Sequence, residues 1–396
     1  MMEGWKETEV DKNPVNWEMV LFPKFVILQR GKDLTKVNFK TGNVPVAGSS
    51  GIIGYHDTSF VKAPGVTVGR SGSCGQVCYY ETDFWAHNTS LYVKDFNGND
   101  ELFSYFYLSY LDIGRYKTGV SVPTLDRNSL NNIKIPLPPL PEQRKIAHVL
   151  STVQKAIEQQ DNLICTTNEL KKALMQKLFT EGTRGEPQRK TEIGLVPESW
   201  EVVRIGDMYE FTSKPRGLDI GSPVPFIPMD LVPFNELEIN KYVLRDKVSS
   251  GTYVENGDLL LAKITPSFEN GKQGFVSIDK PFAYATTEVI PIKEKQGLSD
   301  KFYLYYFLLK DDIRSQLTGK MEGSTGRQRL SKTVLEETLI PKPSLSEQIE
   351  IAKMYISFDK KISFCNSKKQ TLTALFKTLL HELMTGQRRV HEMEFK

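Results

Sequence analysis

Cysteine, histidine and long apolar runs are scarce in this sequence of 396 residues. No two of the four cysteines form a Cys-x-x-Cys pair, and the five histidines are scattered, so we expect reduced structural thiols and no metal site. No apolar run approaches the roughly 20 residues that a membrane span needs. The first residues, MMEGWKETEVDKNP, are charged and lack the apolar core of a signal peptide, which favours a cytoplasmic protein.

The sequence also lacks the motifs that nucleotide-dependent and methyl-transferring enzymes need. Gly271-Lys272 and Gly319-Lys320 have neither the upstream glycine nor the following hydroxyl residue of a phosphate-binding loop. There is no Asn/Asp-Pro-Pro-Tyr/Phe tetrapeptide and no Gly-x-Gly-x-x-Gly that opens a helix. Asp258 and Lys263 flank a leucine-rich strand, but without a Glu-x-Lys partner they make a poor nuclease site. We therefore predict no catalytic residue, which favours a binding protein or a scaffold.

The overall composition is that of an ordinary globular protein, with 39% hydrophobic and 25% charged residues. A chain of this length exceeds the usual single domain of roughly 100–200 residues, so we expect two units that each bury a core. The net charge of +3 permits a nucleic-acid partner without arguing for one. Any DNA footprint must therefore come from local clusters of basic residues.

An internal repeat organises the chain. Trp17 recurs as Trp200, 183 positions later, each followed by glutamate, whereas the Glu142-Gln143 pair recurs 205 positions later as Glu347-Gln348. The growth of the offset from 183 to 205 means that the second half carries 22 extra residues. We expect some of them in the proline-rich stretch from Gly221 to Phe234.

Both halves follow the same order of local patterns. A Gly/Ser-punctuated region rich in β-branched and aromatic residues predicts short strands and a hairpin, and an aromatic helical segment, a basic loop, a proline-rich hinge and a long helix follow. The predicted hairpins are Val66–Tyr80 and Gly257–Val276. The predicted helical segments are Leu102–Leu111 and Lys301–Lys310. The predicted hinges are Ile135–Gln143 and Ile340–Gln348.

The two long helices carry apolar residues at alternating steps of four and three, which is the seam of a coiled coil. About 38 residues at 1.5 Å each give a rod of roughly 57 Å. Two matched helices in one chain favour antiparallel pairing with each other, and pairing between two chains is the alternative. The predicted seam residues are Ile146, Leu150, Val153, Ile157, Ile351, Tyr355, Phe358, Ile362, Leu372, Phe376 and Leu379.

These patterns predict an α+β protein with two globular α/β domains in tandem, each followed by a long helix, with the two helices paired as an antiparallel coiled coil. The expected segments are a first domain at 1–139, a helix at 140–182, a linker at 183–197, a second domain at 198–344, a second helix at 345–386 and a tail at 387–396.

The segments that lead into the long helices carry a family resemblance. IPLPPLPEQRKIAHVL, from Ile135, and the helix after it resemble the central conserved region of the DNA specificity subunits of type I restriction-modification systems, the HsdS family. IPKPSLSEQIEIAKMY, from Ile340, and its helix resemble the C-terminal conserved region of that family. Because each segment follows a domain that opens on Trp-Glu, the resemblance covers nearly the whole chain. Ser346 stands where the first hinge has Pro141, which softens the second hinge without changing the assignment.

The resemblance implies a non-catalytic subunit in which each target-recognition domain reads one half of a split sequence in double-stranded DNA. It implies that the helices set the unread spacer and dock two modification subunits, which methylate adenine with S-adenosylmethionine. Two restriction subunits would join them for ATP-driven cleavage. No cofactor is expected in this chain, because S-adenosylmethionine, ATP and Mg²⁺ would act in the partners.

The basic loops before the hinges, with nearby strand ends, are the expected contacts with DNA. Arginine and lysine can neutralise phosphates, while serine and threonine can bond phosphates or base edges, and a solvated polar loop is the alternative. The predicted contacts are Arg70, Arg115, Lys117, Thr118, Ser121, Arg127, Lys214, Arg216, Lys263, Lys272, Lys320, Ser324, Thr325, Arg327, Arg329 and Lys332. Two other functions remain open from the residues alone: an autonomous DNA methyltransferase or nuclease, and a coiled-coil scaffold that reads no sequence.

Overall fold

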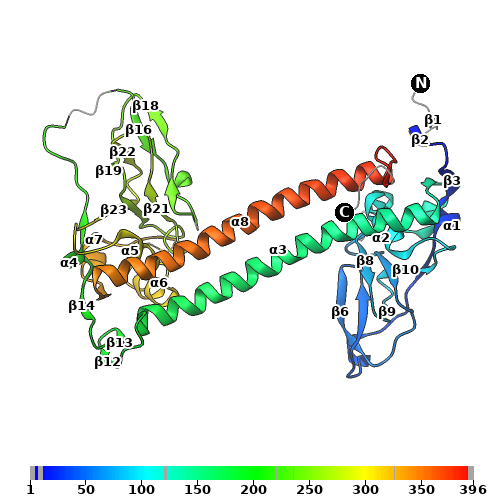
Figure 1. Cartoon of the computed structure of the whole chain (residues 1–396), viewed down its shortest axis with the longest axis horizontal. Helices are drawn as coiled ribbons and strands as arrows, with labels where there is room; N and C mark the ends of the chain where they lie inside the picture. The colour runs from blue at the N-terminus through cyan, green and yellow to red at the C-terminus, as the bar shows by residue number, and fades with distance from the viewer. Residues whose placement is uncertain are drawn as a thin grey trace. The chain divides into compact units, whose positions relative to one another are not determined.

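The computed structural model describes residues 5–7, 12–119, 123–218, 222–234, 236–324 and 326–390. The chain forms two compact units, one of residues 1–161 and 367–396 and the other of residues 162–366. Each unit joins one domain of strands and short helices to part of both long helices, α3 (Leu140–Glu181) and α8 (Leu345–Met384) (Figure 1). Within the described ranges, none of the helices combines the length and the apolar character of a membrane span.

Unit 1 contains a four-stranded sheet, a three-stranded sheet and two strand pairs. The first sheet has the order β4 (Ile27–Arg30), β10 (Ser90–Asp95), β7 (Gly65–Gly69), β8 (Val77–Tyr80), and the second has the order β6 (Gly51–His56), β5 (Val44–Gly48), β9 (Trp85–Ala86). The pairs are β1 (Trp5–Glu7) with β2 (Lys12–Pro14) and β3 (Glu18–Leu21) with β11 (Lys134–Leu137). The helices are α1 (Phe22–Phe25), η1 (Lys36–Asn38), α2 (Glu101–Tyr110), η2 (Ile113–Tyr116) and η3 (Arg127–Leu130).

Unit 2 repeats this plan with additions. Its larger sheet has the order β15 (Tyr209–Phe211), β23 (Val289–Glu294), β20 (Leu259–Ala262), β21 (Gln273–Val276), β17 (Glu238–Ile239), and its second sheet has the order β18 (Val243–Arg245), β16 (Val224–Ile227), β22 (Phe282–Ala285), β19 (Thr252–Glu255). The strand pairs are β14 (Glu201–Arg204) with β26 (Leu339–Lys342), β12 (Gln188–Thr191) with β13 (Gly194–Pro197), and β24 (Glu322–Ser324) with β25 (Arg327–Arg329). The helices are α4 (Ile205–Met208), η4 (Met229–Leu231), α5 (Lys301–Phe307), α6 (Asp311–Thr318) and α7 (Lys332–Glu336).

The structure confirms the tandem repeat and both predicted hairpins, β7 with β8 and β20 with β21. Each second sheet holds a parallel pair, β5 with β9 in unit 1 and β16 with β22 in unit 2, so β16 is the counterpart of β5. Because β16 lies inside the stretch 221–234, the extra residues expected there begin only after Ile227, with η4 and β17. The segment expected to be a plain linker, 183–197, contains the β12–β13 hairpin.

The long helices pack through the expected apolar ladder, and each unit uses the start of one helix and the end of the other. In unit 1, Ile146 and Leu150 of α3 share a core with Leu379 of α8. In unit 2, Ile351 and Tyr355 of α8 share a core with the end of α3, where the Phe179 ring stacks on Tyr355 at 6.0 Å between centroids. All eleven predicted seam residues are buried or half-buried. The helices are therefore antiparallel within each unit.

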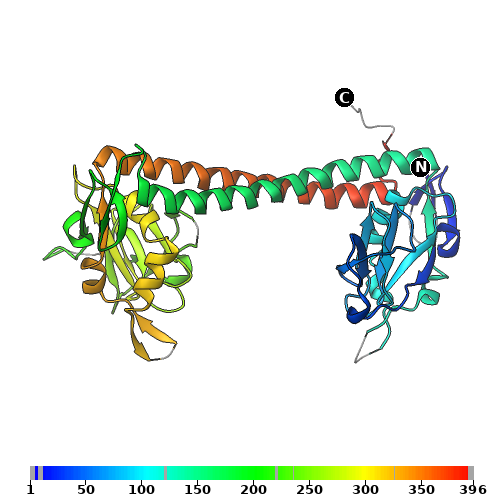
Figure 2. The same ribbon diagram turned by 90° about the horizontal axis from the view of Figure 1, so that it is seen from below.

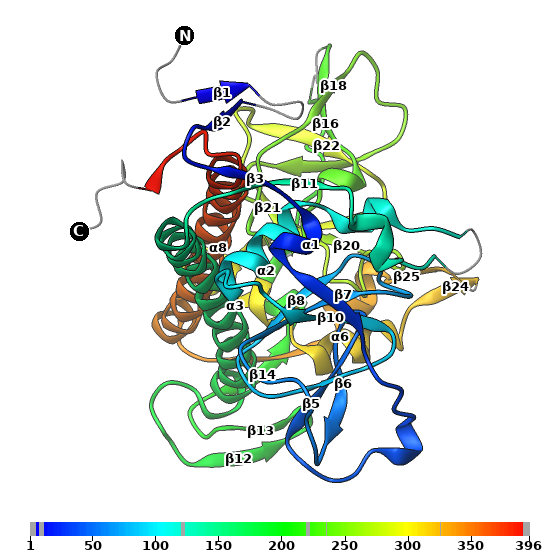
Figure 3. The same cartoon turned by 90° about the vertical axis from the view of Figure 1, so that its right-hand side faces the viewer.

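A narrow ribbon of β24 and β25 leaves the body of unit 2. It extends from the domain on the side away from the long helices, as the orange strand pair in Figure 2 and the β24 and β25 labels in Figure 3 show. The sequence predicts a basic loop here, and the structure gives a two-stranded hairpin instead. The reason is a ladder that pairs Glu322 with Arg329 and Ser324 with Arg327.

Candidate nucleic-acid interface

The repeated tryptophan and glutamate meet at the start of each long helix. Trp17 Nε1 donates to Glu142 Oε2 at 3.1 Å, and Trp200 Nε1 donates to Glu347 Oε2 at 3.1 Å. Both tryptophans are fully buried in their cores. Because a buried indole N–H needs an acceptor, the glutamate joins the opening strand of each domain to its helix. The repeated Trp-Glu and Glu-Gln motifs therefore serve to attach the domains.

The glutamine after each glutamate connects the start of the long helix to the short aromatic helix of its domain, which is α2 in unit 1 and α5 in unit 2. Gln143 Oε1 accepts from Asp100 N at 3.0 Å, and Gln348 Oε1 accepts from Asp300 N at 3.0 Å. Asp100 and Asp300 in turn cap α2 and α5, accepting from backbone N–H groups at 2.8 and 2.9 Å. Each domain is thus held to the start of its long helix through two adjacent side chains. Sequence reasoning found this motif but not its role.

A second repeated junction brings basic residues together on each domain. In unit 1, Leu125 N donates to Arg70 O at 2.8 Å and Arg70 N donates to Thr89 O at 2.8 Å. In unit 2, Leu330 N donates to Lys263 O at 2.7 Å and Lys263 N donates to Glu288 O at 2.9 Å. In each unit these two hydrogen bonds fix the end of a strand, β7 or β20, beside the short helix that precedes the hinge, η3 or α7. A basic residue stands two positions further along in both units, as Arg127 and Lys332.

In unit 1 this junction borders a basic groove of about 740 Å³. Arg70 and Arg127 line it together with Arg30 of β4 and Lys94 of β10. Arg127 Nη1 donates to Leu28 O at 3.3 Å, which holds its side chain over β4. Within the described ranges, the other three basic side chains form no ion pair. Asp126 also lines the groove, with its carboxylate accepting from Asn128 N at 3.0 Å.

Two basic residues of this groove, Arg30 and Lys94, were not predicted from the sequence. Arg30 and Lys94 come from β4 and β10, which pair across more than sixty positions of the chain, and no local pattern predicts that pairing. The Cys74 thiol lies 3.0 Å from Arg70 O and 2.9 Å from Pro123 O, and its single hydrogen can be donated to either oxygen. The thiol therefore joins the β7–β8 turn to the segment before η3. A half-buried thiol that contacts two loop carbonyls could not be recognised from the spacing of cysteines.

In unit 2 the corresponding surface holds Lys263, Arg329 and Lys332. Arg329 Nε and Nη2 donate to the two carboxylate oxygens of Glu288, each at 2.9 Å. These hydrogen bonds hold the pKa of Glu288 below its ordinary value. The Lys332 ammonium lies 5.0 Å from the centre of the Phe211 ring and 3.3 Å from Glu336. The structure therefore gathers these three predicted residues around the base of the ribbon.

The remaining predicted contacts are more dispersed. Arg115 Nη2 donates to the Tyr116 hydroxyl at 2.9 Å, and Lys117 and Thr118 are exposed just after it. Lys272 Nζ donates to Met229 O at 2.7 Å and lies 4.8 Å from the centre of the Phe234 ring, so its ammonium is held against the domain. Lys214 and Arg216 are exposed in the segment after β15, and Lys320 and Ser324 are exposed at the foot and end of β24. Ser121 and Thr325 lie outside the described residues.

Asp258 and Lys263, which flank the leucine-rich strand β20, are held at its two ends. Asp258 is buried, accepts from Thr212 Oγ1 at 2.9 Å and from Glu255 N at 2.8 Å, and stands at the opposite end of β20 from Lys263. Burial raises its pKa to about 6. Among the described residues, no group of histidine, cysteine, aspartate and glutamate has the arrangement of a metal site.

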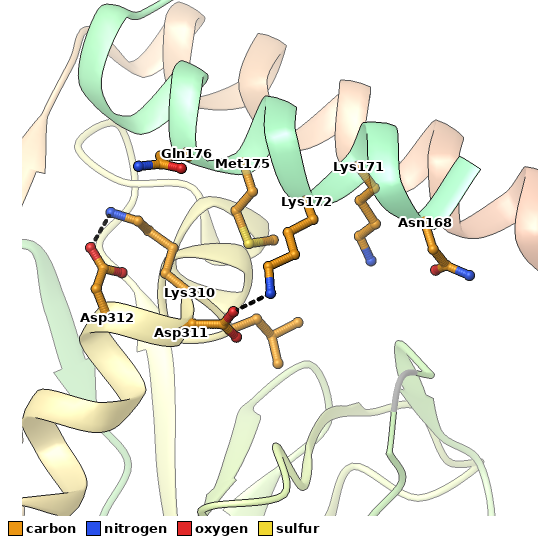
Figure 4. Close-up of a pocket in the computed structure, with 9 residues that line it drawn as sticks. Asn168, Lys171, Lys172, Met175, Gln176, Lys310, Asp311 and Asp312 are labelled. Atoms are coloured by element: carbon orange, nitrogen blue, oxygen red, sulfur yellow. Dashed lines mark ion pairs between the residues drawn. The ribbon is translucent and has the colours of Figure 1, made fainter. Parts of the chain in front are cut away.

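A pocket of about 370 Å³ lies beside α3 in unit 2 and carries charges of both signs. Its rim holds Lys172 paired with Asp311 at 2.7 Å and Lys310 paired with Asp312 at 3.2 Å (Figure 4). Lys171, also on its wall, pairs with Asp359 of α8. Since these cations are neutralised by neighbouring acids, the pocket is a less suitable phosphate site than the groove of unit 1.

Comparison with known proteins places this architecture in one family. A family model described as the type I restriction modification DNA specificity domain matches residues 14–164 and again residues 197–374. The MjaVIII specificity subunit of Methanocaldococcus jannaschii is 30% identical over 287 residues, covering 70% of this chain and 67% of that protein. The putative MjaX specificity subunit of the same organism is 27% identical over 430 residues, covering 98% and 97%.

Solved structures show the same fold. The crystal structure of the type I restriction-modification S subunit from M. genitalium superimposes with a TM-score of 0.65 at 18% identity, covering 97% of this chain and 99% of that one. The two matched regions together span most of the sequence, and each contains one of the repeated domains. The chain therefore belongs to the type I restriction-modification DNA specificity family, of which it carries two domains in tandem.

Proposed function

We propose that this specificity subunit binds double-stranded DNA through both domains, reads a target in two separate halves and performs no chemistry itself. The observation that carries the proposal is the repeated junction in which Arg70 and Arg127, or Lys263 and Lys332, flank the same pair of backbone hydrogen bonds. A basic residue pair fixed to the scaffold can neutralise phosphates at a defined position and so align a domain on the duplex.

The long helices support a role as the spacer between the two half-sites. Helix α3 has 42 residues, and at 1.5 Å per residue its length is about 63 Å. Two domains that read one face of a duplex stand about one helical turn apart, roughly 34–36 Å. A rod of this length can carry that separation, so the number of helical residues would set the number of unread base pairs.

The helices also support docking of the modification subunits. In unit 2, Leu163 and Leu170 of α3 are 43% and 54% exposed, and Phe364 of α8 is 63% exposed. Contiguous exposed apolar patches mark surfaces that other proteins cover, and these three side chains on the two helices would contribute to such a patch. S-adenosylmethionine would then act in the modification subunits, and ATP and Mg²⁺ in two restriction subunits. Methylation of a base in duplex DNA requires its extrusion from the stack, and a rigid reader that fixes the position of the enzyme suits that step.

Selection from a randomised duplex pool tests the proposal. The subunit is assembled with its modification subunits, and bound DNA is enriched and sequenced. We expect two short blocks separated by a spacer of fixed length. The absence of enrichment would support a scaffold, and methylation or cleavage by the subunit alone would support an autonomous enzyme.

A double substitution tests the basic residues of the unit 1 junction, and a single substitution on α3 is its control. Arg70→Ala with Arg127→Ala should weaken binding of the assembled complex to all duplexes. Lys177→Ala should leave binding unchanged, because Lys177 is an exposed lysine of α3 whose partner is Glu181 at 3.7 Å. Equal losses from the two variants would contradict a role for the junction.

A further inference from the structure

The ribbon of unit 2, β24 paired with β25, has the form of an element that can enter the major groove of DNA. A two-stranded antiparallel ribbon fits the major groove of B-DNA, which is about 12 Å wide. Strands β24 and β25 form such a ribbon, and their residues except Gln328 are exposed. The ribbon extends away from the domain body, on the side opposite to α3 and α8 (Figure 3). Nothing in the body of unit 2 covers its described end.

The foot of the ribbon is fixed to the domain. Gln328 N donates to Thr265 Oγ1 at 3.1 Å, and Thr265 N donates to Gln328 O at 3.0 Å. The bidentate pair of Arg329 with Glu288 adds a second attachment. At Gly323, with φ of +136°, a Cβ atom would come within 2.6 Å of Arg327 O, so only glycine permits this approach of the strands. These contacts therefore fix the paired positions of Ser324 and Arg327 relative to the domain.

The basic residues at the ribbon differ in how their charges are used. Arg329 is paired with Glu288, and Lys332 packs over Phe211. Arg327 is exposed, and within the described part of the chain its guanidinium has no hydrogen-bond or ion-pair partner. The ladder sets Ser324 directly opposite Arg327, on the same face of the ribbon. Arg327 is thus a free guanidinium with a hydroxyl beside it, at the outer end of a rigid strand pair.

We propose that Arg327 reads a guanine of one half-site from the major groove. This deepens the proposed function and rests on it. The planar guanidinium can donate two parallel hydrogen bonds to N7 and O6 of guanine, which no other base presents in that arrangement. Ser324 contacts the same or the adjacent base edge. Lys263 and Lys332, at the foot of the ribbon, contact phosphates and position it.

Substitution by lysine separates base reading from charge. The full complex with its modification subunits is first used to select the target of the wild-type chain, and Arg327→Lys and Arg327→Ala are then carried through the same selection. Because lysine keeps the charge and loses the two-pronged geometry, we expect Arg327→Lys to lose discrimination by roughly 5- to 150-fold at a single guanine of one block. All positions of the other block should keep their preferences.

Lys320→Ala is the control. Lys320 is an exposed lysine just before the ribbon, so its loss should weaken binding to all duplexes alike, without changing any base preference. Unchanged unfolding temperatures of the Arg327 variants would show that they fold, as expected for a side chain without internal partners.

Three outcomes overturn the inference. If Arg327→Lys retains all the wild-type base preferences, Arg327 is a phosphate contact and not a base reader. Equal weakening of all sequences by Arg327→Ala would lead to the same conclusion, and altered preferences in both blocks would exclude a local reader. If the wild-type complex selects no sequence block, the proposed function itself fails. If it selects two clear blocks and Arg327→Lys selects the same ones with the same preferences, only the role of Arg327 as a base reader is refuted.

Discussion

Arg389 donates from Nε and Nη2 to the two carboxylate oxygens of Glu142, at 2.8 and 3.0 Å. Arg389 follows the last turn of α8, and Glu142 stands in the first turn of α3, where it also accepts from Trp17. In unit 2 the corresponding carboxylate, Glu347, accepts instead from Thr183 N and Oγ1 at 3.0 and 3.1 Å. In both units, therefore, a residue that follows the end of one long helix donates hydrogen bonds to the glutamate in the first turn of the other long helix.

Replacement of Arg389 by alanine should destabilise unit 1. The side chains of Arg389 and Glu142 are only 16% and 11% exposed, so removal of the arginine leaves a poorly hydrated carboxylate with fewer partners. We expect a loss of about 3 kcal/mol in the free energy of unfolding, measured by urea denaturation. The neighbouring pair offers the control: Arg388 and Glu382 are 49% and 25% exposed, and Arg388→Ala should cost less than about 1 kcal/mol. Equal losses would contradict the account.

The stability of unit 2 should depend on the protonation of Asp258. Burial raises the pKa of its carboxyl to about 6 in the folded chain, above the ordinary value of 3.8 that we assign to the unfolded chain. The folded state therefore binds the proton more tightly, so this group lowers stability most above pH 6 and ceases to do so as the pH falls through 6 towards 4.

Asp258→Asn should remove that dependence, since its amide oxygen can still accept a hydrogen bond and carries no charge. The difference in unfolding free energy between variant and wild type should change by at most about 3 kcal/mol between pH 4 and pH 7, in favour of the variant at pH 7. Urea midpoints across this range measure it. A difference that does not vary with pH would refute the assignment.

The groove of unit 1 predicts two phosphate contacts that the sequence did not reveal. Arg30→Ala and Lys94→Ala should each weaken DNA binding by the assembled complex and reduce the slope of log affinity against log salt by about 1. The control is Lys62→Ala, because Lys62 is exposed on the same domain, lies outside the groove and pairs with Asp83 at 2.7 Å. If all three variants show the same salt slope as the wild type, the groove does not bind phosphates.

Patterns with a fixed period could be predicted well from the sequence. The steps of four and three that include Ile146, Leu150 and Tyr355 depend only on helix geometry, and the structure buries these residues along both helices. The repeated order of strands could also be predicted, because each hairpin is local. Helix α5 ends at Phe307, earlier than the expected Lys310, because a separate helix, α6, begins at Asp311.

Features that depend on distant pairing could not be predicted in the same way. The groove requires β4 to lie beside β10, and the ribbon requires Arg329 to meet Glu288, which is 41 positions away. The sequence also does not tell which arginines are already neutralised, so it does not distinguish Arg327 from Arg329. Long-range strand pairing, and not composition, decides which charges remain free to bind DNA.

If the long helices set the distance between the two half-sites, a change in their length should change the unread spacer. Residues 162–168 lie between Asp161 and Lys171 on α3, and residues 362–368 lie between Asp359 and Lys369 on α8. The four flanking residues form the ion pairs Asp161–Lys369 in unit 1 and Lys171–Asp359 in unit 2, so duplication of both seven-residue segments adds one heptad to each helix and keeps both pairs.

The variant and the wild type are each assembled with modification subunits and carried through selection from the randomised duplex pool. Seven residues add about 10 Å to the helices, which corresponds to about three base pairs. We expect the same two blocks with a spacer that is longer by about three base pairs. The same blocks with an unchanged spacer would contradict the claim that the long helices set the distance between the half-sites.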